Sequence, residues 1–215
     1  MNRLYILLVI IALSSFSCKE HEHSVLIEAE SFLSKGGWLV DPQFVEQMGS
    51  PYLIAHGLGK PVADAETKAA VSEAGKYHVW VRTMNWAPGN WLAPGRFRIA
   101  INERVLENEL GTREDWGWQY AELINIKDTT FSLKLQDLTG FDGRCDAIFL
   151  STERKSPPDD IKDLKVWRKN MTGESEAPSV TESFDLVVVG GGIAGCAASV
   201  AARSPGCNAH RANAD

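Results

Sequence analysis

The feature that most constrains the fold is a series of short apolar runs between residues 25 and 151, separated by Gly, Pro, Asn and Asp. In the run that starts at Tyr77, the side chains of Tyr77, Val79 and Val81 alternate with those of His78, Trp80 and Arg82. A period of two is typical of a strand with one face in a core. No helix-length amphipathic pattern interrupts the region. We therefore predict a mainly β chain with a jelly-roll β-sandwich over residues 25–151.

The clearest strands are expected at residues 25–30, 77–83, 96–101, 118–126, 130–135 and 146–151. In the third of these, Phe97, Ile99 and Ile101 alternate with arginines and are expected to face the core. We assign Trp38 and Trp80 to packing. Roughly 125 residues are enough to bury an independent core.

Residues 1–17 have the pattern of a signal peptide: Arg3, then an apolar run that is too short to span a bilayer comfortably. Cys18 follows small residues, and this resembles a bacterial lipoprotein signal, in which the cysteine is lipidated. The match is incomplete, because Ser15 stands where that signal usually has Leu. Ordinary signal cleavage is the alternative. Both interpretations place the protein outside the cytoplasm, either periplasmic or anchored to the outer membrane or cell surface through Cys18, with residues 18–24 as a tether.

Composition limits the function classes. A formal net charge of −6 argues against a nucleic-acid partner, because phosphates require a basic surface. The cysteines form no C-x-x-C pair, so no zinc or redox motif is present. No Asp or Glu lies in a recognisable hydrolase motif, and we name no catalytic residue. Cys145 is expected to be a core thiol in the final strand.

Residues 152–183 are expected to form a linker. Ser156-Pro-Pro-Asp-Asp contains helix-start residues, and one short helix is expected within 160–170. The part after Thr172 is rich in Gly, Glu, Ser and Pro, which is typical of a flexible segment.

Residues 184–215 begin with a continuous apolar run, followed by Gly190, Gly192 and Gly195 in G-x-G-x-x-G spacing and an Ala-rich helix over 193–203. This order is that of the first strand, glycine turn and helix of a dinucleotide-binding domain. A second strand is expected after the helix, but residues 204–215 contain no β-branched or aromatic residue. We therefore predict a truncated Rossmann-like fragment, from a natural or an artefactual stop.

The glycine segment resembles FAD-dependent oxidoreductases of the glutathione-reductase-like type, particularly exported bacterial ones with an N-terminal sandwich. The resemblance implies that Gly190, Gly192 and Gly195 contact the FAD pyrophosphate in a full-length parent. One strand and one helix bury too little apolar area to hold such a ligand. We expect that the 215-residue chain itself does not bind FAD measurably, and NAD remains an alternative for the fragment.

Three segments of the sandwich resemble galactose-binding-like carbohydrate-binding modules, especially families 6 and 35. They are Ile27-Glu-Ala-Glu, Ala74-Gly-Lys-Tyr-His-Val-Trp-Val-Arg and Cys145-Asp-Ala-Ile-Phe-Leu. The resemblance implies a structural calcium held by Glu28, Glu30 and Asp146. Alternate residues of a strand share a face, so both glutamates are expected to point the same way, and calcium takes oxygen ligands. The alternative is that these carboxylates are solvated charges at a sheet edge.

Such modules bind sugars by stacking them on aromatic rings in loops, because sugar faces are apolar while their hydroxyls need polar partners. The candidate ring residues are Trp86, Trp91 and Trp116, in segments rich in Gly and Pro or polar residues. Polar partners are expected among Arg82, Asn85, Asn102 and Asp142. The alternative is that the tryptophans plug the ends of the sandwich or face another domain.

Three functions remain open on the sequence. The first is the N-terminal part of an exported FAD-dependent oxidoreductase whose sandwich binds carbohydrate, with this chain inactive by itself. The second, from another class, is a non-catalytic surface lipoprotein that captures glycans. The third is a sandwich that only caps a flavin domain.

Overall fold

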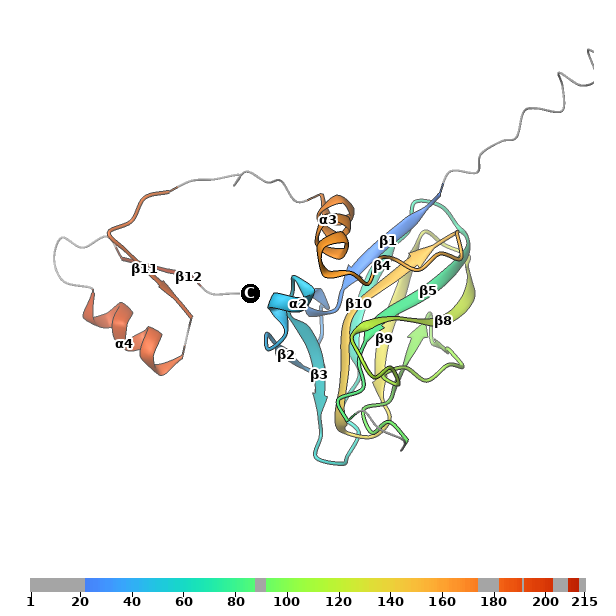
Figure 1. The fold of residues 1–215 in the computed structure, drawn as a ribbon, viewed down its shortest axis with the longest axis horizontal. Helices are drawn as coiled ribbons and strands as arrows, with labels where there is room; N and C mark the ends of the chain where they lie inside the picture. Colours follow the sequence, from blue (N-terminus) through green and yellow to red (C-terminus); the bar gives the residue numbers. More distant parts are fainter. Residues whose placement is uncertain (1–21, 88–91, 174–181, 191, 203–208, 213–215) are drawn as a thin grey trace, which may run out of the picture. The chain divides into compact units, whose positions relative to one another are not determined.

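The computed structural model describes residues 22–87, 92–173, 182–190, 192–202 and 209–212, and the chain divides into two compact units, 1–173 and 174–215. The first unit is a β-sandwich of two antiparallel sheets (Figure 1). The fold class predicted from the sequence, mainly β with a jelly-roll sandwich, is confirmed.

The larger sheet has six strands, in the order β2-β3-β10-β5-β8 with β1 paired to β10. Their bounds are β1 Ser24–Glu28, β2 Leu39–Asp41, β3 Tyr52–His56, β5 Gly75–Thr83, β8 Gly117–Ile126 and β10 Phe141–Ser151. The smaller sheet has the order β4-β9-β6-β7. Its strands are β4 Ala65–Ala70, β6 Phe97–Ile101, β7 Arg104–Val105 and β9 Thr130–Asp137.

The core lies between the sheets and is formed by the residues that the alternation predicted. Tyr77, Val79 and Val81 of β5 are buried there, as are the three apolar residues of β6, Phe97, Ile99 and Ile101. Trp38 packs edge-on against Phe97 with ring centroids 5.6 Å apart. Cys145 is fully buried in β10. Antiparallel pairing of β5 with β8 and β10 fixes which face each of these residues takes.

Within the described parts of residues 22–173, three helical segments accompany the sheets: η1 Ala29–Ser31, α2 Val45–Met48 and α3 Ile161–Thr172. Helix α3 begins at Asp160, whose carboxylate accepts hydrogen bonds from the backbone N–H groups of Lys162 and Asp163, as an N-cap does. It ends at Gly173, which adopts the left-handed conformation. The helix expected after Ser156-Pro-Pro-Asp-Asp is therefore present.

Helix α3 covers the outer face of the larger sheet, on which the side chains point away from the core between the two sheets. Leu164, Trp118, Ala147 and Phe149 form a second buried cluster. The indole N–H of Trp118 donates to the Pro158 carbonyl at 3.2 Å, and Trp167 packs on Trp118 with ring centroids 5.7 Å apart. The expected linker of 152–183 is therefore wrong in its first part, because residues up to Gly173 belong to the sandwich unit.

Strand β1 ends at Glu28, two residues earlier than expected, and Glu30 lies in the 3₁₀ helix η1. The prediction that Glu28 and Glu30 share a strand face is therefore wrong. The chain leaves the sheet after Glu28, where the Ser31 hydroxyl donates to the Glu28 carbonyl at 2.6 Å. Strands β2, β3, β4 and β7 were not among the expected ones.

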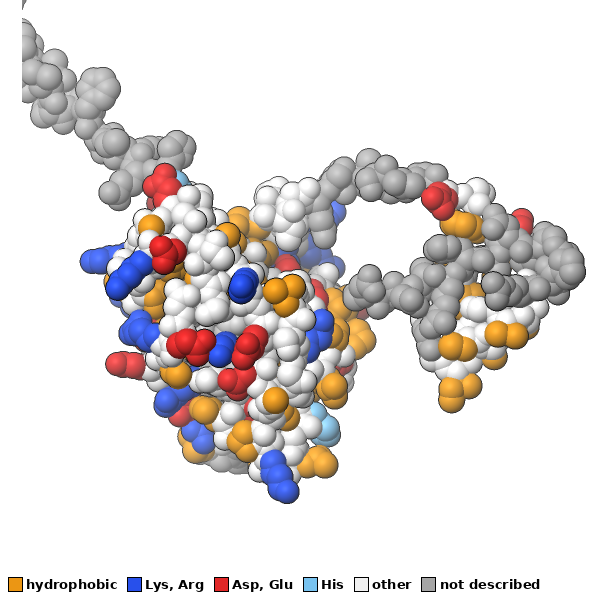
Figure 2. Space-filling model, turned by 180° about the vertical axis from the view of Figure 1, so that it is seen from behind, with side chains coloured by type: hydrophobic (Ala, Val, Ile, Leu, Met, Phe, Trp, Pro, Cys, Tyr) orange, Lys and Arg blue, Asp and Glu red, His pale blue; other side chains and the backbone are white. Residues whose placement is uncertain are grey.

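The described part of the second unit contains β11 Leu186–Val189, α4 Ile193–Ala201 and β12 Ala209–Ala212. Strands β11 and β12 pair in parallel. The prediction that no strand follows the helix is wrong, because backbone groups suffice for pairing and β12 has no proline. Apolar side chains of this unit, such as those of Val189 and Ile193, are exposed (Figure 2). On the face of the sandwich in the same view, acidic and basic side chains are intermixed.

Candidate functional site

Three loops meet at the end of the sandwich where β3, β5 and β9 finish (Figure 1). We call this region the loop end; its described residues are 57–64, 84–87, 92–96 and 137–143. The Gly140 carbonyl accepts hydrogen bonds from Gly57 N–H at 3.0 Å and Gly59 N–H at 3.2 Å. The hydroxyl of Thr139 donates to the Pro94 carbonyl. These bonds join the three loops to one another.

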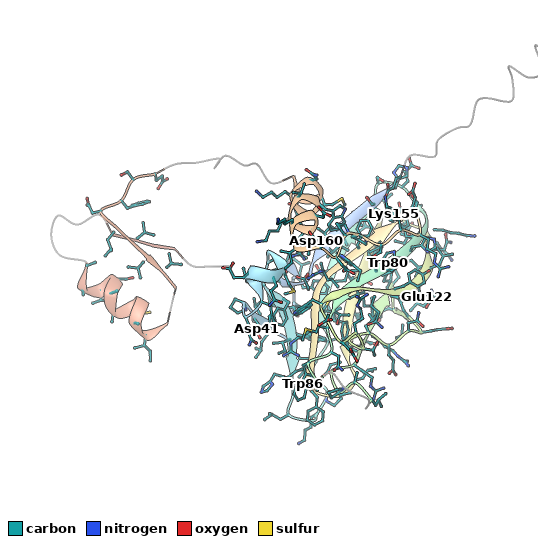
Figure 3. All side chains as sticks on the ribbon, in the orientation of Figure 1. Asp41, Trp80, Trp86, Glu122, Lys155 and Asp160 are labelled. Carbon is teal, nitrogen blue, oxygen red and sulfur yellow. The ribbon has the colours of Figure 1, made fainter. Side chains whose placement is uncertain are left out.

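Trp86 lies at the loop end (Figure 3) and is 40% exposed, the largest exposure of any tryptophan in the described residues. The preceding Asn85 is buried, and its side chain donates to the Ala87 carbonyl at 2.9 Å while accepting from Ala87 N–H at 3.2 Å. Asn85 N–H also donates to the Arg113 carbonyl at 2.6 Å. The turn that carries Trp86 is thus braced on both sides, and the indole is presented to solvent.

Other groups at the loop end complement the indole. Phe141 is 48% exposed, and its ring lies over Gly59, where a Cβ would be 3.0 Å from the ring. Next to it, Asp142 pairs with His56 at 2.5 Å between Oδ1 and Nδ1. The loop end therefore offers exposed aromatic rings together with polar groups that accept or donate hydrogen bonds. Sequence reasoning missed Phe141 and His56, because a lone Phe or His at the end of a strand carries no pattern.

The other two candidate tryptophans are placed differently. Trp116 is half-buried and packs against Tyr52 and Phe44, with ring centroids 5.0 Å and 5.8 Å away. The Arg82 guanidinium lies 6.0 Å from the centre of its ring. This matches the alternative in which an indole plugs the sandwich. Trp91 lies outside the described residues.

The remaining polar candidates are used within the fold. Asn102 has a positive φ of 48° in the turn before β7, and its side chain accepts from Ser132 N–H at 3.0 Å. Arg82 is only 2% exposed. Of the four polar candidates, Asn85 and Asp142 lie at the loop end.

Two of the carboxylates predicted to hold calcium, those of Glu28 and Asp146, meet at arginines, and Glu30 lies close enough to feel the charges of Asp146 and Arg168. We call Glu28, Glu30, Asp146, Arg82 and Arg168 the ion cluster. Arg168 Nη2 donates to Asp146 Oδ2 at 2.8 Å and to Glu28 Oε2 at 2.9 Å. Arg82 Nη1 donates to the same Asp146 oxygen at 3.2 Å. Asp146 is fully buried and Arg168 is 6% exposed, so these charges compensate one another away from water.

Burial and neighbouring charges shift the titration of this cluster. Burial raises the pKa of Glu30 to about 7, and Asp146 adds to the rise while Arg168 opposes it. Burial likewise raises the pKa of Asp146, against the opposing effect of Arg168 and Arg82. For Arg168, burial favours a lower pKa, but the carboxylates of Asp146 and Glu28 raise the pKa overall.

As they lie, the three carboxylates do not fit a calcium ion, because the guanidinium of Arg168 stands among them. Within the described ranges, no group of three or more His, Cys, Asp or Glu side chains is placed to hold a metal. The sequence could not reveal Arg168, because it lies in a segment expected to be a linker.

A shallow pocket of about 200 Å³ lies on the smaller sheet. Leu33 and Leu133 are its apolar residues, and Glu66, Lys68 and Lys134 are its charged ones. No aromatic side chain lines it, so it lacks the ring that a sugar face would stack on.

In the glycine motif of the second unit, the first and third glycines have the backbone geometry that the spacing predicted. Gly190 has a φ of +104°, which favours glycine. A Cβ on Gly195 would overlap the Gly190 carbonyl, so the third glycine permits helix α4 to approach the end of β11. Gly192 is the N-cap of α4, and a Cβ on it would meet no atom within 4 Å. The lipidation candidate Cys18 lies outside the described residues. Among the described helices, none has the length and apolarity needed to cross a membrane.

No protein-family model matches the chain, and no curated protein does. Solved structures do. A β-(1,4)-mannanase of Podospora anserina with GH26 and CBM35 parts has 15% identity and a TM-score of 0.49; the match covers 78% of this chain and 36% of that chain. A family 35 carbohydrate-binding module from Clostridium thermocellum has 16% identity and a TM-score of 0.48, over 59% of this chain and 96% of that one.

The C-terminal CBM6 of a laminarinase from Zobellia galactanivorans has 19% identity and a TM-score of 0.45, over 60% of this chain and 99% of that one. The chain thus spans about a third of the mannanase and nearly the whole length of the two modules. All three TM-scores are below 0.5, so the description of the fold rests on the strand pairing of this chain.

Proposed function

We propose that the sandwich binds carbohydrate at its loop end. The observation that carries the proposal is the exposed indole of Trp86 on a turn braced by Asn85. An exposed, fixed ring offers an apolar face on which the C–H groups of a sugar stack without further ordering of the protein. An exposed indole gives a sugar an apolar face to cover, and this supports a binding role.

The polar groups of the loop end support the same ligand class. Sugar hydroxyls need hydrogen-bond partners when their water is displaced, and Asp142 and His56 supply an acceptor and a nitrogen at this end. Trp91 follows Trp86 closely in sequence, and on that ground alone we include it as a further ring on which a sugar could stack. In the alternative function, the sandwich only caps another domain, and its loop end binds no glycan.

Trp86→Ala is expected to weaken glycan binding at least tenfold, equivalent to about 1.4 kcal/mol, because it removes the stacking face. Affinity electrophoresis in polysaccharide gels measures the change. The free energy of unfolding should shift by no more than about 0.5 kcal/mol, since the side chain is exposed. Leu58→Ala, which removes another exposed apolar side chain of the loop end, is the matched control and should retain binding. Unchanged affinity in Trp86→Ala would place the ligand elsewhere.

We also propose that residues 184–212 are the pyrophosphate-binding start of a flavin domain. The supporting observations are the parallel pairing of β11 with β12 and the close approach of Gly195 to Gly190. Gly190, Gly192 and the N-terminus of α4 would hold the pyrophosphate, since backbone N–H groups there are free of intrahelical partners. When bound, FAD supplies two-electron redox chemistry, and the sandwich would belong to an oxidoreductase.

The flavin proposal is tested on the natural protein, purified from its source organism. We expect bound flavin, detected as fluorescence released on denaturation, in that protein. The 215-residue chain alone is expected to release none, because the second unit leaves its apolar side chains exposed and buries too little area to order a ligand. Absence of flavin from the natural protein would contradict the proposal and leave the carbohydrate proposal intact.

A further inference from the structure

Four oxygen atoms from three separate segments surround the guanidinium of Arg168. Nη1 donates to the Met48 carbonyl at 2.7 Å and to Ser50 Oγ at 2.8 Å. Nη2 donates to Glu28 Oε2 at 2.9 Å and to Asp146 Oδ2 at 2.8 Å. These segments are the end of β1, the stretch from the end of α2 to the approach to β3, and strand β10. They are up to 140 residues from Arg168 in sequence and share this one cation.

Two carboxylates, a backbone carbonyl and a hydroxyl form an oxygen set of the type that Ca²⁺ takes in proteins. We propose that the guanidinium of Arg168 takes the place of a divalent metal ion in this cage. It follows that the sandwich is stable without metal, and that removing the guanidinium converts the cage into a calcium site. The inference does not depend on the carbohydrate or the flavin proposal.

The charges of the cage agree with this substitution. With Arg168 and Arg82 present, two guanidiniums balance the carboxylates of Glu28 and Asp146. Without Arg168, those two carboxylates face one guanidinium, that of Arg82, and a negative charge is left unbalanced. A divalent cation balances that charge, whereas in the native chain a metal ion would add positive charge to a neutral cluster.

Helix α3 carries Arg168 and holds its guanidinium in the cage. Trp167, the residue before Arg168, packs against Phe149 and Trp118 with ring centroids 5.2 Å and 5.7 Å away. The Thr172 hydroxyl donates back to the Arg168 carbonyl at 3.0 Å. Packing of the helix on the sheet thus places the charge, and the charge in turn fixes the ends of β1 and α2. The helix thus holds these parts of the sandwich together.

The test is thermal unfolding of the full chain followed by tryptophan fluorescence, which reports the sandwich because all seven tryptophans precede residue 173. The Tm of the native chain should be the same, within about 1 °C, in EDTA and in millimolar CaCl₂. Arg168→Met keeps the length of the side chain and removes its charge. Its Tm in EDTA should fall by about 10 °C, because buried carboxylates lose their partner. Millimolar CaCl₂ should restore at least half of that loss.

Two further variants make the result specific. Arg104→Met removes an exposed arginine that pairs with Glu122, and its Tm should change by no more than about 2 °C with no response to CaCl₂. In Arg168→Met combined with Glu28→Gln, the calcium response should be lost, because one ligand and one charge are gone.

Stabilisation of the native chain by CaCl₂ would overturn the proposal, as would an Arg168→Met variant that folds but does not respond to calcium. If Arg168→Met folds only with CaCl₂ present, the proposal is supported. If it folds under neither condition, calorimetric titration of the native chain with CaCl₂ decides: no binding supports the proposal, and binding overturns it.

Discussion

Replacing Asp146 by Ala is expected to lower the free energy of unfolding of the sandwich by about 4 kcal/mol. Asp146 is fully buried and accepts hydrogen bonds from both Arg82 and Arg168. Its removal leaves two buried guanidiniums short of an acceptor and of the charge that compensates them. Because breaking one partner of a buried ion cluster exposes the full desolvation cost of the others, the loss exceeds that of an ordinary polar substitution.

Urea unfolding followed by tryptophan fluorescence measures this loss. The matched control is Asp142→Ala, which removes a carboxylate that pairs with the exposed His56 and should cost no more than about 1 kcal/mol. A loss below about 1 kcal/mol for Asp146→Ala would mean that the buried guanidiniums find other partners or water, and the ion cluster would then not hold the fold.

The second large effect is a pH dependence that arises from Glu30. Its folded-state pKa is raised to about 7 from an ordinary value of 4.5, with burial as the largest cause. Between these values the unfolded chain releases the proton and the folded chain keeps it. The stability that Glu30 contributes is therefore present below pH 4.5 and is lost as the pH rises to about 7. Allowing for its partial exposure, we expect a loss of about 2 kcal/mol.

Glu30→Gln keeps the shape of the side chain and removes the titration. The variant should be as stable as the native chain at pH 4 and more stable by about 2 kcal/mol at pH 8. Denaturant unfolding at both pH values measures the difference in the free energy of unfolding between the variant and the native chain. The contributions of all other titrating groups cancel in this difference, because the two chains share those groups. A difference that does not change with pH would show that Glu30 ionises in the folded chain as it does in the unfolded one.

The sandwich could be predicted from the sequence where local pattern decides structure. Tyr77, Val79 and Val81 show the period of two of a half-buried strand, and the structure places them in the core. Strand β2, only three residues long, offers too short a pattern to detect. The start of α3 could be predicted because Asp160 is an N-cap, which is a local signal. Which residues of α3 are buried could not be predicted, because that depends on the sheet on which the helix packs.

The candidate site was harder to predict, because the exposure of a side chain and the identity of its hydrogen-bond or ion-pair partners depend on residues distant in sequence. Trp86 and Trp116 look alike in sequence, yet one is held outward by Asn85 and the other packs under Tyr52. The carboxylates Glu28 and Asp146 were found from their motifs. The cation between them was not, because no local pattern links Arg168 to a residue 140 positions away.

A nuclear magnetic resonance titration of the full chain with the oligosaccharide that it retains best in a polysaccharide panel tests the proposed function most directly. We expect the indole N–H signal of Trp86 and the backbone signals of Phe141 and Asp142 to shift in proportion to saturation, while those of the buried Trp38 and Trp118 stay unchanged. Failure of every glycan to bind, or shifts that gather at Ser132 and Lys134 in the pocket of the smaller sheet, would contradict a carbohydrate site at the loop end.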